Sequence, residues 1–107
     1  MITGKWQTHA KSPLGDMDPV LVLRCEEDGK LRGECYVPPT STDPIELKKG
    51  KWEGDSFSFR FAKEVKMAGK NIGKMDFTWS GQVEGTQISG KIKALMGAIP
   101  FHGERLE

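Results

Sequence analysis

Two cysteines and two histidines are the most chemically distinctive side chains of this 107-residue chain. They are Cys25, Cys35, His9 and His102. A thiol can form a disulfide or act as a nucleophile, and an imidazole can activate a thiol or bind a metal ion. Which of these reactions is open depends on the elements that position the four side chains.

Acidic side chains offer a second kind of chemistry. Asp16, Asp18, Asp43 and Glu64 fall in expected loops, where a carboxylate can act as a general acid or base and can equally stabilise a turn. The chain contains no phosphate-binding loop, dinucleotide fingerprint, nucleophile elbow or paired-ligand zinc motif. From the sequence we therefore assign no catalytic residue, no metal ligand and no cofactor.

Length and charge limit the class of protein. The chain is long enough for one core, which predicts a single domain over residues 1–107. Its 16 basic and 15 acidic side chains are interspersed, which argues against nucleic acid or an anionic membrane as partner. No apolar run approaches the roughly 20 residues of a membrane span. Without a basic and apolar signal segment at the start, we expect a cytoplasmic protein, although a removed leader would change the compartment and not the fold.

The hydrophobic pattern predicts an all-β chain. Thirteen glycines and six prolines separate short stretches in which apolar and polar residues alternate, and no stretch has the period of a helix. The expected strands span residues 3–10, 19–26, 30–37, 45–52, 56–63, 71–84, 87–93 and 98–106.

Turn chemistry sets the expected register of three hairpins. A three-residue loop that ends in Gly29 places Leu21 opposite Cys35, and Cys25 opposite Leu31. The two cysteines are then about 13 Å apart along neighbouring strands, whereas a disulfide needs Cα atoms within about 7 Å. We therefore expect two free thiols. Two-residue turns at Gly54-Asp55 and Gly85-Thr86 pair Trp52 with Phe57 and Val83 with Ile88.

These strands predict a single antiparallel up-and-down β-barrel of about eight strands. A β-bulge at Lys49-Gly50 is required to turn both Leu47 and Trp52 inward. Every second connection is expected to be long, over residues 11–18, 38–44, 64–70 and 94–97. Because alternate connections of such a meander lie at opposite ends, the pattern predicts one pinched end and one open mouth.

Short motifs add a resemblance to a known group of barrels. Gly4-Lys5-Trp6 and Arg105 resemble the signature of the calycins, which include lipocalins, fatty-acid-binding proteins and avidins. The resemblance implies a cation–π contact between Trp6 and Arg105 at the pinched end. Antiparallel pairing would then place His9 opposite His102, both outward. Two histidines without a third ligand do not make a zinc site.

Two further stretches are similar to avidins in particular, residues 28–33 and 78–82. Avidins place polar contacts two and four residues before the later tryptophan, where this chain has Phe77 and Met75. The implied pocket is thus more apolar than a biotin site. The tail from Phe101 to Arg105 also looks like that of the small glycine-rich barrel domains common in bacteria.

The pattern favours binding of a small, largely apolar or aromatic molecule in the open end, by a protein that is not an enzyme. The expected ligand-binding residues are Thr8, Leu21, Cys35, Val37, Leu47, Phe59, Phe61, Met75, Phe77 and Phe101 in the barrel, with Met17, Met67 and Met96 on the rim.

Three alternatives stay open. One is a small barrel enzyme, such as an isomerase, cyclase or hydrolase of an apolar substrate, that uses a rim carboxylate or Cys35. The second is a structural or interaction domain whose interior is filled by side chains. In the third, the apolar rim contacts a second copy of the chain.

Overall fold

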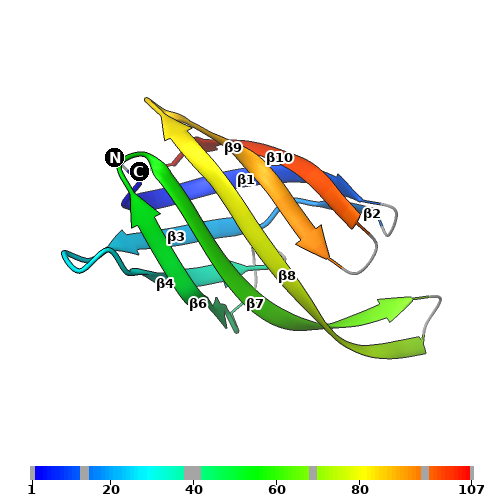
Figure 1. Ribbon diagram of the computed structural model, residues 1–107. Helices are drawn as coiled ribbons and strands as arrows, with labels where there is room; N and C mark the ends of the chain where they lie inside the picture. Colours follow the sequence, from blue (N-terminus) through cyan, green and yellow to red (C-terminus); the bar gives the residue numbers. More distant parts are fainter. Residues whose placement is uncertain (1, 13–14, 38–41, 68–69, 95–96, 107) are drawn as a thin grey trace.

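The computed structural model describes residues 2–12, 15–37, 42–67, 70–94 and 97–106, with side chains except at 12–17 and 64–72. This part of the chain is an all-β barrel (Figure 1). Its strands are β1 (Gly4–Ser12), β2 (Gly15–Met17), β3 (Val20–Cys25), β4 (Leu31–Tyr36), β5 (Ile45–Glu46), β6 (Lys48–Glu53), β7 (Ser56–Met67), β8 (Lys70–Glu84), β9 (Gln87–Ala94) and β10 (Gly97–Arg105).

The strands pair antiparallel in the order β5-β4-β3-β1-β10-β9-β8-β7-β6, and β2 pairs with the end of β1. β5 and β6 are separated only by Leu47 and together take one strand position. β2 and β3 share another position along β1, interrupted by Asp18 and Pro19, because proline lacks the N–H that a ladder needs. The described residues thus occupy eight positions of a nearly closed up-and-down barrel, which confirms the predicted fold class.

The barrel closes along a seam between β4 and β6. The Leu47 N–H donates to the Gly33 carbonyl at 3.0 Å, and the Trp52 N–H donates to the Gly29 carbonyl at 3.0 Å. Because the β5–β6 segment pairs with β4 at one end and with β7 at the other, it joins the two edges of the sheet.

The β-bulge predicted at Lys49-Gly50 is confirmed. Lys48 pairs with Arg60 and Lys51 pairs with Ser58, so β6 has one residue more than β7 between these pairs. The backbone of Lys49 is left-handed, with φ of 50°.

The three hairpin registers predicted from turn chemistry are also confirmed. Leu21 lies opposite Cys35, Trp52 opposite Phe57, and Val83 opposite Ile88. Both cysteines are free thiols. At the junction of the first and last strands, Trp6 pairs with Arg105 and His9 with His102, as the resemblance implied.

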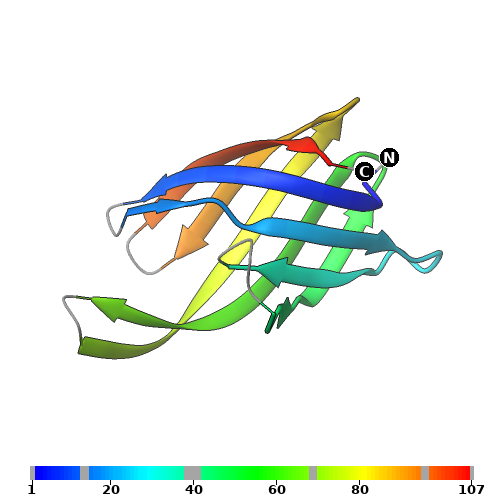
Figure 2. The same cartoon turned by 180° about the vertical axis from the view of Figure 1, so that it is seen from behind.

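Three of the four predicted long connections are wrong. β1 continues to Ser12 and β2 starts at Gly15, β7 continues to Met67 and β8 starts at Lys70, and Ala94 pairs with Gly97. The far part of the β7–β8 hairpin extends beyond the ends of the neighbouring strands (Figure 2). The alternation of apolar and polar residues ends before these segments, but backbone groups can continue to pair whatever the side chains.

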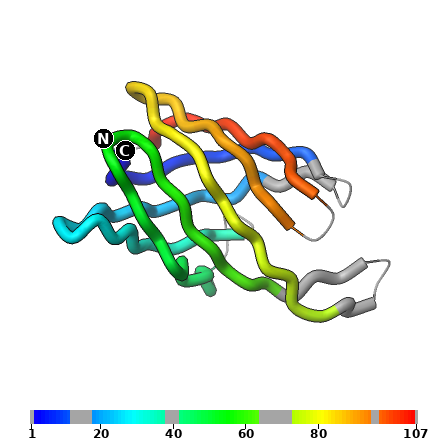
Figure 3. The backbone as a smooth tube through the Cα atoms, viewed as in Figure 1, coloured from blue at the N-terminus to red at the C-terminus, as the bar shows by residue number. Residues whose placement is uncertain are grey.

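Alternate turns lie at opposite ends of the barrel, as the meander predicts. The turns at 26–30, 54–55 and 85–86 lie at the end that also holds both chain termini (Figure 3). The strand ends that flank residues 13–14, 68–69 and 95–96 lie at the opposite end, which we call the mouth (Figure 3).

A tryptophan and an arginine cover the end of the barrel that holds both termini. Trp6 is fully buried, and the Arg105 guanidinium carbon lies 4.2 Å from the centre of its ring, which confirms the expected cation–π contact. The Trp6 indole N–H donates to the carbonyl of Ile2 at 2.9 Å. Ile2 itself is 1% exposed and belongs to the core, which the strand pattern did not predict.

Candidate functional site

The inward-facing side chains change from buried to half-exposed along the barrel. Those in the middle, such as Leu21 and Phe59, are fully buried. At the mouth, the apolar side chains that pack on this core are only partly covered. They are Val37, which directly follows β4, and Ile45, Met75, Ala94 and Ile99, from β5, β8, β9 and β10. Five parts of the chain thus present an incomplete apolar ring at one end.

The predicted ligand-binding residues fall into three groups. Leu21, Cys35, Leu47, Phe59, Phe61, Phe77 and Phe101 are buried core residues, and Thr8 is buried with them. Val37 and Met75 lie in the half-exposed ring. Met17 is the last residue of β2 and Met67 the last residue of β7, and the structure does not describe their side chains. Met96 lies outside the described residues.

An aromatic cluster fills the middle of the barrel beneath the ring. Trp79 lies 4.7 Å from Phe101 and 5.5 Å from Phe59, measured between ring centres. Phe61 lies 5.6 Å from Phe77 and 6.2 Å from Trp79. These are typical separations of packed aromatic pairs. Most of the predicted lining therefore packs against itself and forms a floor below the mouth.

Thr8, predicted as a polar anchor for a ligand, has a structural contact. Its hydroxyl donates to the carbonyl of Pro19 at 2.6 Å, and its backbone N–H donates to the same oxygen at 3.1 Å. These two bonds hold the interruption between β2 and β3 against β1. The donor of Thr8 is therefore already used.

Trp79 carries a polar group that the sequence did not single out. Its ring is fully buried, and its indole N–H has no acceptor among the described residues. Trp6 and Trp52 differ in this respect, because their N–H groups donate to the carbonyls of Ile2 and Glu26. An unpaired buried donor costs about 1–3 kcal/mol, so Trp79 offers a free donor within the aromatic floor.

Lys63 is an inward cation that sequence reasoning missed. It pairs with Met75 and continues the alternation of Phe57, Phe59 and Phe61 along β7, so it has inward parity. Its side chain is half-buried, and its charge acts on the Cys35 thiol. The alternation could have revealed it, but the predicted strand ended at this residue.

Cys35 is poorly suited to act as the nucleophile of an enzyme. Burial raises the pKa of its thiol to about 12, and the opposing effect of the Lys63 charge is smaller. At pH 8 roughly one thiol in ten thousand would then be ionised, and the thiolate is the reactive form. Thr8 is the only polar residue that is buried in the described part of the barrel, so no buried carboxylate or imidazole lies beside the thiol there.

This arrangement predicts different reactivities for the two thiols. In native Cys25→Ser protein, Cys35 should react with Ellman's reagent at least about 100-fold more slowly than in the same protein unfolded in urea. Native Cys35→Ser protein should react faster, because Cys25 is only half-buried. Rapid modification of Cys35 in the folded protein would contradict its burial. It would again favour the alternative in which Cys35 is the nucleophile of an enzyme.

The two histidines lie on the outer surface, as predicted. The His9 ring nitrogens contact Asp18 at 3.1 Å and Glu104 at 3.3 Å, and its ring centre is 5.5 Å from that of His102. The hydrogen bonds to Asp18 and Glu104 raise the pKa of His9. No group of three or more His, Cys, Asp or Glu side chains in the described ranges is arranged to hold a metal ion.

Of the four expected rim carboxylates, Asp18 and Asp43 have described side chains. Asp18 is exposed and engaged with His9, and Asp43 is exposed. The side chains of Asp16 and Glu64 are outside those that the structure describes. The described residues thus place no acidic group in the apolar ring.

Comparison with known proteins adds no template for this site. Among the described residues no helix is long and apolar enough to cross a membrane. The chain matches no protein-family model, no curated protein and no solved structure. A function is therefore inferred from the geometry of the site, which is an apolar ring above an aromatic floor with Lys63 at the edge.

Proposed function

We propose that the protein binds a small, largely apolar or aromatic molecule at the mouth of the barrel. The observation that carries this proposal is the half-exposed apolar ring, in which Val37, Ile45 and Met75 lie above a floor of buried aromatic side chains. Exposed apolar surface gathered in one place costs free energy in water, and a ligand that covers it recovers that free energy.

Polar groups at the site restrict the ligand further. Lys63 is a cation at the edge of the ring, and the Trp79 N–H is a free donor in the floor. Ligand sites typically combine apolar walls with a few polar groups that orient the molecule. We therefore expect a ligand with an apolar body and a hydrogen-bond acceptor or an acidic group at one end.

The resemblance to calycins is in line with this function. We infer a calycin-like barrel from the antiparallel meander and from the contact between Trp6 and Arg105 at the end that holds both termini. The inference concerns the architecture, since one barrel type supports many functions.

Binding of N-phenyl-1-naphthylamine, a neutral aromatic dye, tests the proposal. We expect its fluorescence to rise with the protein and the melting temperature to increase, because a ligand that binds only the folded state stabilises it. Met75→Arg should weaken binding at least about tenfold, because it places a second cation in the ring at a half-exposed position that the fold tolerates. Phe77→Arg should abolish binding by charging the floor.

Asp76→Arg is the matched control, because Asp76 is the exposed neighbour that points to the other side of β8. It should bind the dye as the parent does. Equal binding by all three variants, or no binding of the dye or of a panel of apolar molecules, would overturn the proposal. The filled interior of an interaction domain would then be the better explanation, and sedimentation would show whether a second copy covers the ring.

A further inference from the structure

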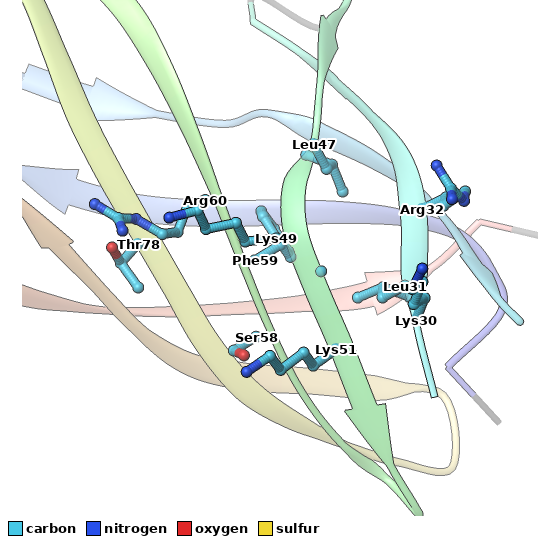
Figure 4. Close-up of a pocket in the computed structure, with 11 residues that line it drawn as sticks. Lys30, Leu31, Arg32, Leu47, Lys49, Lys51, Ser58, Phe59, Arg60 and Thr78 are labelled. Carbon is cyan, nitrogen blue, oxygen red and sulfur yellow. The ribbon is translucent and has the colours of Figure 1, made fainter. Parts of the chain in front are cut away.

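A groove on the outer wall of the barrel gathers positive charge. It has a volume of about 550 Å³ and crosses the seam where β6 lies between β4 and β7 (Figure 4). Its lining contains five cationic side chains, two hydroxyl side chains and no carboxylate. The residues are Lys30, Leu31, Arg32, Leu47, Lys49, Gly50, Lys51, Ser58, Phe59, Arg60 and Thr78.

Three of the five cations are not neutralised by a described neighbour. Lys30 pairs with Asp28 at 3.8 Å, and Arg32 pairs with Glu26. Lys49, Lys51 and Arg60 form no ion pair with any residue that the structure describes. Like charges that gather in this way repel one another and do not stabilise the fold.

The free cations lie in two parts of the groove (Figure 4). From β6, Lys49 extends across β7 toward Arg60, and Lys51 extends toward Ser58 (Figure 4). Arg60 lies opposite Thr78 in the pairing of β7 with β8, and Ser58 lies opposite Lys51 in the pairing of β6 with β7. Three cationic groups and two half-buried hydroxyls thus share one surface.

The backbone of Lys49 makes this cluster more specific. Its φ of 50° is left-handed, a conformation that lysine rarely adopts. The glycine of the bulge is at position 50, where a Cβ atom would lie 1.9 Å from the carbonyl oxygen of Leu31. Glycine is therefore needed for packing against β4, while the strained position holds a lysine that points into the groove. Strained residues concentrate at functional sites.

We propose that this groove binds a small molecule that carries a phosphate or polyphosphate group. Such a group has two or more negative charges and several acceptor oxygens, which match the free charges of Lys49, Lys51 and Arg60 and the hydroxyls of Ser58 and Thr78. The groove is small and concave, and the whole chain carries a net charge of only +1. A small ligand fits these properties better than an extended polyanion.

This site is separate from the mouth. Its lining includes Leu47 and Phe59 of the buried core but no residue of the apolar ring, and its cations and hydroxyls lie on the outer face. The two proposals therefore succeed or fail independently.

Tripolyphosphate is the probe for the test, with sodium chloride at matched ionic strength as its reference. We expect it to raise the melting temperature of the parent protein in a saturable way. Lys49→Gly should be at least as stable as the parent without ligand, because glycine relieves the left-handed strain. The same variant should bind tripolyphosphate at least about fivefold more weakly, and Lys51→Gln should weaken binding similarly.

Lys5→Gln is the matched control, because it removes an exposed lysine of β1 outside the groove. It should bind tripolyphosphate as the parent does. If Lys5→Gln and Lys49→Gly lose tripolyphosphate affinity equally, the anion is attracted only by net positive charge. If tripolyphosphate does not raise the melting temperature of the parent protein, the groove does not bind it. Either result overturns the proposal. Binding only to anionic lipid vesicles or to nucleic acid, with no response to tripolyphosphate, overturns it as well.

Discussion

Trp6→Ala is expected to lower the free energy of unfolding by about 3–5 kcal/mol, the usual cost of removing a large buried aromatic side chain. Trp6 is fully buried, its indole N–H bonds to Ile2, and its ring contacts the Arg105 guanidinium. The substitution thus removes packing, a hydrogen bond and a cation–π contact at once. In a domain of this size the melting temperature should fall by at least about 12 °C. Urea unfolding followed by circular dichroism measures the loss directly.

Two milder variants separate these contributions. Trp6→Phe lacks the N–H that bonds to Ile2. Because it keeps an aromatic ring against Arg105, it should lose much less stability than Trp6→Ala. Arg105→Met keeps a long apolar side chain at this position. It removes the charge and the 2.8 Å hydrogen bond to the Thr3 carbonyl, which should cost about 0.5–2 kcal/mol. A cost below about 1 kcal/mol for Trp6→Ala would show that this end of the barrel is not held by the tryptophan.

Gly50→Ala is expected to destabilise the protein by about 3 kcal/mol or more, at the upper end of the cost of inserting atoms into a packed site. The new methyl group would lie 1.9 Å from the Leu31 carbonyl oxygen and 2.8 Å from its carbon. Both are backbone atoms, so β6 must move away from β4. Because few backbone hydrogen bonds cross this seam, we expect the barrel to open there first.

Hydrogen exchange locates this opening. The amides of Leu47 and Trp52 bond to the carbonyls of Gly33 in β4 and of Gly29 in the turn before it. They should lose protection in Gly50→Ala before amides of the β8–β9 pair do. Gly54→Ala is the control, because Gly54 has φ of 60° and nothing within 4 Å of an added Cβ. Gly54→Ala should lower the free energy of unfolding only by the cost of a left-handed alanine, about 1–2 kcal/mol. Equal stability of the two variants would show that β6 does not press against β4.

Much of the candidate site could be predicted as a set of inward positions but not as a binding surface. The alternation placed Val37, Met75 and Phe77 on one side of the sheet, and the structure agrees. It did not separate side chains that pack together, such as Phe59 with Trp79, from those that stay half-exposed, such as Met75. That difference depends on distance from the end of the barrel and on how the rings fill its width, which no local pattern contains.

The cationic groove is the clearest case of a property that only the fold creates. In the sequence, basic and acidic residues are interspersed and nearly equal in number, which predicts no site for an anion. In the barrel, Lys30 directly before β4 and Arg32 of β4 lie across the closing seam from Lys49 and Lys51 of β6, and Arg60 of β7 lines the same groove. Their acidic neighbours in the sequence pair with only some of them.

The resemblance to calycins, and no local pattern, implied the pairing of Trp6 with Arg105. The sequence by itself determined the inward face of each strand, the three tight hairpins and the bulge at Lys49-Gly50. Each depends on local turn chemistry or on a period of two, which act over a few residues. Only the tertiary structure decided that the strands continue up to residues 12 and 67, that the charge of Lys63 acts on the Cys35 thiol, and that the Trp79 N–H has no described acceptor. These features depend on how far backbone pairing continues and on which side chains the closed barrel brings together, and both follow from contacts between residues far apart in the chain.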